Sequence, residues 1–209
     1  MGAIPSTDMP GHRTLRDRVS LALGRCQETQ SVDFKESAPW EALQWKIIAT
    51  CMAMANLRDG GIIVIGASER GSTWELTGIS AEHLATYDVD AILDRVNVFA
   101  SPPVEIDVVT HRYGDGNTFL VFSIHEFSET PIVCRENGPD RKGLRGATVY
   151  VRPLGMPRTT MVTNAAQMHE LLELAAEKRA RRILEVSRRV GMVPGTSDRQ
   201  RLDEELEGL

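Results

Sequence analysis

Several features are scarce or missing in this chain, and each absence excludes a class of protein. Only three cysteines occur among 209 residues, with no CxxC pair: Cys26, Cys51 and Cys134. This spacing favours reduced thiols and disfavours a zinc ribbon or a disulfide-rich secreted domain. The longest nearly unbroken apolar stretch, Ile47 to Leu57, is about half of a membrane span, and the N-terminal segment is too polar for a signal peptide. We therefore expect a cytoplasmic protein with no membrane partner.

Nucleotide and hydrolase motifs are missing as well. The sequence contains no GxxxxGK[ST], no GxGxxG opening a helix, no GxSxG and no HExxH among its five histidines. Gly60 and Gly61 follow a predicted helix and precede a predicted strand. That order suits a tight turn and is the wrong one for holding phosphate at a helix N-terminus. We expect no nucleotide cofactor and no zinc.

A positive overall charge is also lacking, since 24 Lys and Arg face 29 Asp and Glu, a net charge of −5. A polyanionic ligand would therefore need a local basic patch. Two segments offer one: residues 135–158 and residues 177–189 each contain six basic and two acidic residues. Either patch alone is also compatible with an ordinary solvated surface.

Apolar periodicity predicts the order of helices and strands. Helices are expected over 12–26, 39–57, 89–98 and 165–190, the second introduced by a Ser37 cap and by Pro39 in its first turn. Strands are expected over 31–36, 62–65, 74–76, 104–113, 118–124, 131–134 and 147–152, with a turn at 69–71 and a hairpin across 114–117. The last helix is expected to turn seven residues inward: Met168, Leu171, Leu172, Ala175, Ile183, Val186 and Val190.

These elements predict an α+β fold, with a mostly antiparallel sheet, helices packed against it and a long C-terminal helix. Four segments are expected. They are a disordered start over 1–11, a domain over 12–162, a helix over 163–192 and an acidic flexible tail over 193–209.

Three carboxylates lie on or close to two of the predicted strands. Glu28 precedes the first strand, Asp33 lies on it, and Glu69 follows the apolar strand 62–65. If these strands are neighbours, the carboxylates can meet and hold Mg²⁺ or Mn²⁺, because hard cations prefer oxygen ligands. Lys35 shares a face with Asp33 and could hold a phosphate oxygen. With 29 acidic residues, such triples also occur by chance.

The order of segments resembles the Schlafen AlbA-like domain. The resemblance begins with the strand Val32-Asp33-Phe34-Lys35-Glu36 and a helix ending Met54-Ala55-Asn56. It continues with Asp59-Gly60-Gly61 before a strand ending Ile65-Gly66, and with the acidic Glu69-Arg70-Gly71. The later matches are Gly78, Pro102-Pro103, Pro131 and the segment 146–152 with Thr159-Thr160. It covers about residues 26 to 162.

This resemblance implies a nucleic-acid-binding α+β domain. Some Schlafen-type proteins are endoribonucleases that cut structured RNA such as tRNA with three carboxylates and a divalent metal, and these map onto Glu28, Asp33 and Glu69. The family's nuclease body contains two similar lobes, so a chain with one copy is expected to form a homodimer. The family's animal members also carry a Cys/His zinc site, which the three cysteines here do not match.

Three hypotheses remain open on the sequence alone. The first is a metal-dependent endoribonuclease on structured RNA, with Lys35, Arg145, Arg152 and Arg158 on the phosphates. The second is a non-catalytic DNA- or RNA-binding regulatory module, in which the carboxylates have structural roles. The third is a structural or protein-interaction dimer, joined through the basic C-terminal helix.

Overall fold

The computed structural model describes residues 14–71, 73–114, 116–139 and 143–191. The helices are α1 (Leu15–Arg25), α2 (Trp40–Ala55), α3 (Ala81–Leu84), α4 (Val89–Phe99) and α5 (Ala165–Arg189). The strands are β1 (Val32–Lys35), β2 (Gly61–Ile65), β3 (Ala67–Arg70), β4 (Thr73–Leu76), β5 (Ala100–Ser101), β6 (Ile106–Tyr113), β7 (Asn117–Ile124), β8 (Val133–Cys134), β9 (Tyr150–Val151) and β10 (Thr160–Met161). The segments 1–11 and 193–209, predicted to be flexible, lie outside the described residues.

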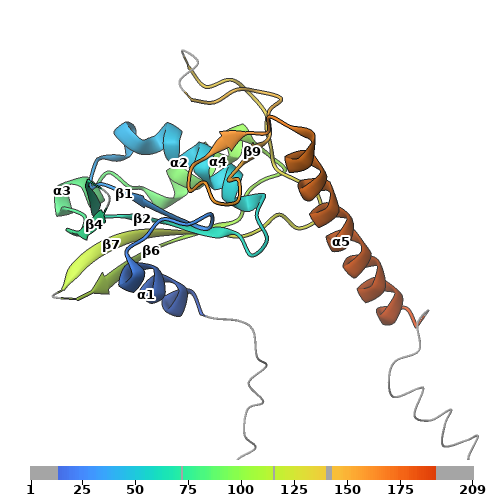
Figure 1. The fold of residues 1–209 in the computed structure, drawn as a ribbon, viewed down its shortest axis with the longest axis horizontal. Helices are drawn as coiled ribbons and strands as arrows, with labels where there is room; N and C mark the ends of the chain where they lie inside the picture. Colours follow the sequence, from blue (N-terminus) through green and yellow to red (C-terminus); the bar gives the residue numbers. More distant parts are fainter. Residues whose placement is uncertain (1–13, 72, 115, 140–142, 192–209) are drawn as a thin grey trace, which may run out of the picture.

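A four-stranded sheet in the order β1-β2-β7-β6 forms the centre of the molecule (Figure 1). Strands β1 and β2 are parallel, and the β2–β7 and β7–β6 pairs are antiparallel. Three antiparallel pairs, β3–β4, β5–β8 and β9–β10, form separate two-stranded sheets. The predicted α+β class with a mostly antiparallel sheet is confirmed. The first two predicted strands, whose pairing the sequence left open, are neighbours.

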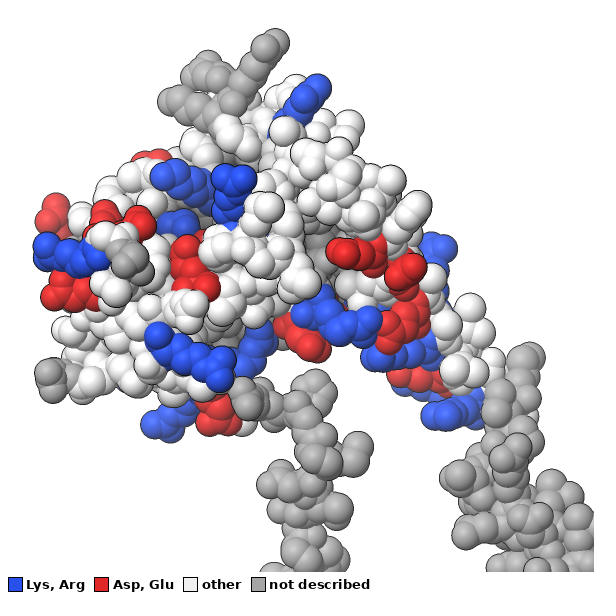
Figure 2. Space-filling model, viewed as in Figure 1, with Lys and Arg blue, Asp and Glu red and all other residues white. Residues whose placement is uncertain are grey.

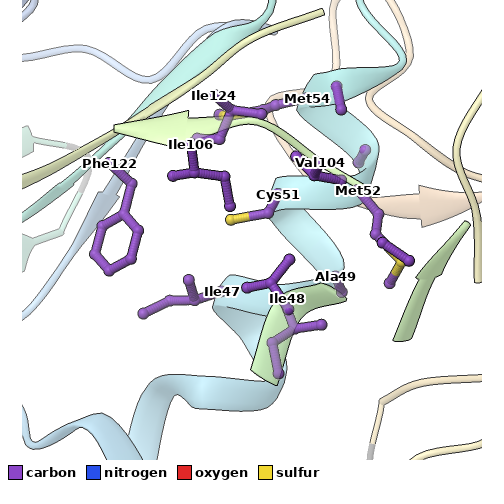
Figure 3. Packing of buried hydrophobic residues seen from close by; sticks show 14 of the residues in the cluster. Ile47, Ile48, Ala49, Cys51, Met52, Met54, Val104, Ile106, Phe122 and Ile124 are labelled. Carbon is purple, nitrogen blue, oxygen red and sulfur yellow. The ribbon is translucent and has the colours of Figure 1, made fainter. Parts of the chain in front are cut away.

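Helices cover both faces of the sheet, which explains the continuous apolar run of β2. Ile63 and Ile65 pack with α2 in the larger core, of which Figure 3 shows a part. Ile62 and Val64 pack with α1 and Phe34 in the smaller core. Because side chains alternate along a strand, Phe34 on the α1 face leaves Asp33 and Lys35 on the α2 face. The strand register agrees, because Asp33 pairs with Ile63, whose side chain packs with α2.

The turn between α2 and β2 requires glycine, as predicted. Gly60 has a φ of 64°, and an added Cβ would lie 2.0 Å from the carbonyl oxygen of Ile124. A side chain at Gly61 would meet Met54 and the Ser31 backbone at 2.6 to 3.0 Å. The pair thus lets the end of α2 approach the end of β7 closely.

Two local predictions are wrong. Ser37 does not cap α2: Pro39 is the N-cap residue without a side-chain bond, and the Ser37 hydroxyl instead contacts His83 and the Ser80 N–H. Glu69 lies within β3, opposite Trp74, and not in a turn. The structure also contains four short elements that the sequence patterns did not predict: α3, β3, β5 and β10.

Helix α5 does not bury all the residues expected. Leu171, Leu174 and Ala175 pack on the body, whereas Leu172, Ile183, Val186 and Val190 are exposed. Figure 1 shows why: only the first part of α5 lies against the body, and the rest extends past it. Ion pairs hold this second part, including Lys178 with Glu126 and Arg182 with Glu129. No helix among the described residues is both long and apolar enough to cross a membrane.

Candidate nucleic-acid interface

One cavity brings together most of the residues singled out from the sequence. It has a volume of about 800 Å³ and lies between β1, α2, β3–β4 and the β9–β10 loop. Five of the seven predicted site residues line it: Glu28, Asp33, Lys35, Glu69 and Arg158. Segments far apart in the sequence thus meet because β1 is the sheet edge over which α2 and the loop close.

The sixth predicted residue, Arg145, lines a second cavity of about 870 Å³. The two cavities share Gly143, Tyr150 and Thr159 as lining residues, so we treat them as one continuous groove. The Tyr150 hydroxyl accepts a bond from the Arg145 N–H at 2.7 Å and donates one to the Gly143 carbonyl at 3.0 Å. This phenol fixes the backbone from which the exposed Arg145 side chain projects.

The seventh predicted residue, Arg152, lies beneath the groove. Arg152 is 1% exposed, and its Nη1 donates a hydrogen bond to Asp33 Oδ1 at 3.0 Å. Its other nitrogens donate to the carbonyls of Gln30, Thr29 and Val32. A guanidinium that is buried and bonded in this way joins β9 to the β1 region, and the expected phosphate contact does not fit this position.

Asp33 has a structural contact on each oxygen. Oδ2 pairs with Lys35 Nζ, which also donates to the Phe34 carbonyl at 3.1 Å, and Oδ1 pairs with Arg152. The shared face predicted for Asp33 and Lys35 is confirmed, but the two side chains bind each other. Asp33 is 3% exposed, so its carboxylate is a buried anchor below the groove floor.

Glu28 is half-buried beside Asp33. Its Oε1 accepts a hydrogen bond from the Phe34 N–H at 3.1 Å. Burial raises the pKa of Glu28 above its usual 4.5, the Phe34 hydrogen bond opposes this rise, and the nearby Asp33 carboxylate adds to it. Glu28 is therefore easier to protonate than an ordinary surface glutamate.

The three predicted metal ligands line one cavity without forming a ligand set. In the part of the chain that the structure describes, no three His, Cys, Asp or Glu side chains lie together in a group that could hold an ion. Both oxygens of Asp33 are already bonded to cationic side chains, and Glu69 is exposed on β3. As these side chains lie, they do not fit Mg²⁺ or Mn²⁺.

The groove also contains residues that sequence reasoning missed. From α2 come Trp45, Lys46 and Thr50, and from β4 comes Trp74. Trp74 packs on Phe34 with ring centroids 5.6 Å apart, which leaves the indole at the groove wall. Nothing in the composition marked these residues, since three tryptophans in 209 residues is an ordinary number. Local periodicity could not show that α2 and β4 face one groove.

Three groove cations are available to a ligand. Lys46, Arg145 and Arg158 are exposed, and none pairs with a carboxylate that the structure describes. Figure 2 shows basic and acidic side chains interspersed on the face in view, so the molecule has no uniformly basic surface there. An anionic ligand would be held at a local site.

Comparisons with known proteins agree with the expected fold. The family model described as Schlafen, AlbA_2 matches residues 28–155, more than half of the chain. This range includes every predicted site residue except Arg158. A search of curated proteins found no match.

Two solved structures are similar at low identity. The DIP2311 protein from Corynebacterium diphtheriae has a TM-score of 0.48 at 19% identity, with 73% of this chain and 27% of that one covered. The N-terminal domain of a protein related to the ATP-dependent DNA helicase RecG, from Nitrosomonas europaea, has a TM-score of 0.38 at 15% identity, with 74% and 93% covered. The chain thus spans about a quarter of the length of the first of these proteins.

Proposed function

The chain belongs to the Schlafen AlbA_2 family, and from that premise we propose that it is a nucleic-acid-binding protein whose ligand lies in the groove. The observation that carries the proposal is the set of exposed cations along the groove without carboxylate partners in the described structure: Lys46, Arg145 and Arg158. Each can neutralise one phosphate, which is the main source of affinity in sequence-independent binding.

The groove combines these cations with aromatic walls. Trp45 and Trp74 line the same cavity as Lys46 and Arg158. Aromatic side chains beside a phosphate track are typical of proteins that bind unpaired strands, because every base can stack on a ring. We infer that structured RNA such as tRNA is the preferred ligand, since it offers both phosphates and unpaired loops. The proposal includes a cytoplasmic location, which the three free cysteines support.

Metal-dependent RNA cleavage is a second candidate. Its support is the placement of Glu28, Asp33 and Glu69 on one cavity. Its obstacle is that Asp33 would first have to leave Arg152 and Lys35. We therefore place binding first and assign no catalytic step.

Titration of the protein into labelled tRNA tests the binding proposal by fluorescence anisotropy. We expect Arg158→Glu and Lys46→Glu each to weaken binding at least fivefold, because each reverses a phosphate contact. Arg188→Glu, at the exposed end of α5, is the matched charge reversal outside the groove and should change binding less than twofold. Equal effects of all three changes would contradict binding in the groove.

The same RNA tests cleavage on a gel, with Mg²⁺, with Mn²⁺ and with chelator. Glu28→Gln and Glu69→Gln are the informative variants, because neither removes the Asp33–Arg152 pair. Cleavage that requires metal and is lost in both variants would establish the second candidate. Intact RNA together with binding that is insensitive to chelator would leave the protein as a binding module.

We also propose that the chain forms a homodimer through α5. Exposed apolar residues at positions 172, 176, 183, 186 and 190 follow one line on this helix, with spacings of four, seven, three and four. Such heptad-like spacing is typical of helices that pair with another helix. A second copy of α5 would cover this α5 stripe (Leu172, Ala176, Ile183, Val186 and Val190).

A further inference from the structure

The loop joining β9 to β10, residues 152–159, presents an apolar tip to solvent. Leu154 is 86% exposed, the highest value among the large apolar residues described, and Met156 is 49% exposed. Exposed apolar side chains of this size are normal when single, but two on one projecting loop require a reason. We call Leu154 and Met156, with the turn that carries them, the apolar finger.

The finger is a stiff structure. The Met156 N–H donates to the Pro153 carbonyl at 3.1 Å, and the Arg158 N–H donates to the Met156 carbonyl at 2.8 Å. Pro153 and Pro157 restrict the backbone on either side, and Gly155 supplies the positive φ of 75° that the turn needs. Little backbone entropy therefore remains to be lost when the tip contacts a ligand.

Both ends of the loop are attached to the walls of the groove. At its start, Arg152 is bound to Asp33 and to backbone carbonyls around β1. At its end, the Thr159 hydroxyl lies 3.1 Å from that of Thr50 on α2. The buried ion pair therefore sets the position of the finger relative to the groove floor.

The finger stands at the rim of the groove. Pro157 and Arg158 line the groove, and Pro153 lines a separate cavity of about 450 Å³ beneath α5. The sequence contains no Asp or Glu from position 141 to position 169, so the finger has no acidic neighbour along the chain. An apolar tip beside an unpaired arginine suits a ligand that has both flat apolar surfaces and phosphates.

Resting on the proposed function, we propose that the apolar finger inserts between adjacent bases of a bound strand at unpaired nucleotides. Proteins that bend nucleic acids use Leu, Met and Pro side chains as such wedges, and insertion costs unstacking energy. That cost is lowest where the bases are not paired. Arg158 would hold the phosphate beside the opened step, and Trp45 and Trp74 offer surfaces on which neighbouring bases can stack.

A strand carrying 2-aminopurine, whose fluorescence rises on unstacking, tests this inference. The full chain is titrated with a single-stranded RNA bearing the probe, and binding is followed separately by anisotropy. We expect the Leu154→Ala, Met156→Ala double variant to lose the fluorescence rise and to bind about five- to tenfold more weakly. Leu184→Ala is the matched control, because Leu184 is also exposed, at 51%, and lies on α5. Thermal unfolding of all variants should be unchanged, since neither tip residue is buried.

The possible results separate the inference from the function on which it rests. If the double variant binds and unstacks like the wild type while Arg158→Glu loses binding, the finger is overturned and the groove stands. If the wild type binds no RNA or DNA, the proposed function fails and the finger with it. Binding of the finger to anionic vesicles in place of RNA would also overturn the inference.

Discussion

At the scale of single residues, the site depends on a buried ion pair whose members were predicted to bind a metal and a phosphate. Asp33 and Arg152, expected to bind metal and phosphate, bind each other at 3.0 Å with both residues at most 3% exposed. Removing one member of a buried pair leaves the other charge without compensation, which costs far more than the pair itself contributes. The pair therefore connects β1 to β9, and with it the groove to the finger.

Arg152→Ala should lower the free energy of unfolding by about 3–5 kcal/mol, since it leaves Asp33 buried beside Lys35 alone. Urea denaturation followed by circular dichroism measures this change. Arg145→Ala, which removes an exposed guanidinium, should change the value by less than about 0.5 kcal/mol. A loss below about 1 kcal/mol for Arg152→Ala would show that the pair is not an anchor.

The raised pKa of Glu28 predicts a pH-dependent stability. A carboxyl whose pKa is higher in the folded state disfavours folding when it is ionised, so the penalty is present above the folded-state pKa and absent below the usual 4.5. Glu28→Gln should therefore stabilise the protein by about 0.5 kcal/mol at pH 7, because the group is only half-buried. The gain should vanish near pH 4. Denaturation curves at several pH values measure it, and a gain independent of pH would contradict the assignment.

At the scale of elements, α5 is held in two different ways. Its first half buries Leu171, Leu174 and Ala175, and its second half is joined to the body by ion pairs such as Lys178–Glu126, at 2.6 Å. Glu177 also pairs with Arg58 and Arg181, which holds the pKa of that carboxyl at about 2. Salt screens the ion pairs and leaves the apolar contacts intact. Raising the salt concentration should therefore loosen the second half of α5 more than the first.

The double variant Glu126→Ala, Glu129→Ala should loosen the second half of α5 but not the first. It should also loosen the turn before β2, because Glu126 accepts a hydrogen bond from the Asp59 N–H at 3.0 Å. Partly exposed pairs such as these contribute about 0.2–1 kcal/mol each, so amide exchange over residues 178–189 should accelerate several-fold. Exchange over 168–175 should stay unchanged. Hydrogen exchange with mass spectrometry resolves the two segments, and 1 M salt should reproduce the effect in the wild type. Glu185→Ala is the control, because Glu185 pairs with no basic residue within the described ranges.

At the scale of the whole molecule, an acidic protein is proposed to bind a polyanion through a local groove. With a net charge of −5, general attraction is absent, and affinity must come from Lys46, Arg145 and Arg158. Three phosphate contacts predict a slope of about −2 to −3 for log affinity against log salt concentration. Arg158→Ala should reduce that slope by about 0.7–0.9. Anisotropy titrations from 50 to 300 mM salt measure both, and an unchanged slope in the variant would place the ligand elsewhere.

The dimer proposal is tested by molar mass in solution. Wild-type protein should elute in light-scattering chromatography at twice 23.1 kDa. Ile183→Glu with Val186→Glu puts charge into the α5 stripe and should give the monomer. Leu184→Glu, on another side of α5, should remain dimeric. A monomeric wild type at high concentration would contradict pairing through this helix.

The family, the α+β class and the glycine turn after α2 were all predictable from the sequence. Each of these follows from local signals: an apolar run buried on both faces, alternation along a strand, and a backbone position that only glycine fits. The sequence also singled out Glu28, Asp33, Lys35, Glu69 and Arg158 as candidate site residues, and the structure places all five on one cavity.

The partners of these residues depend on long-range packing, which local patterns do not encode. Arg152 and Asp33 are 119 positions apart, so no local pattern could reveal that each neutralises the other. The same applies to the groove walls: Trp45 and Trp74 come from different elements and meet only once α2 and β4 pack around β1. The outward face of α5 was misjudged for a related reason. Periodicity identifies an apolar stripe, but only packing against the body determines which part of it is covered.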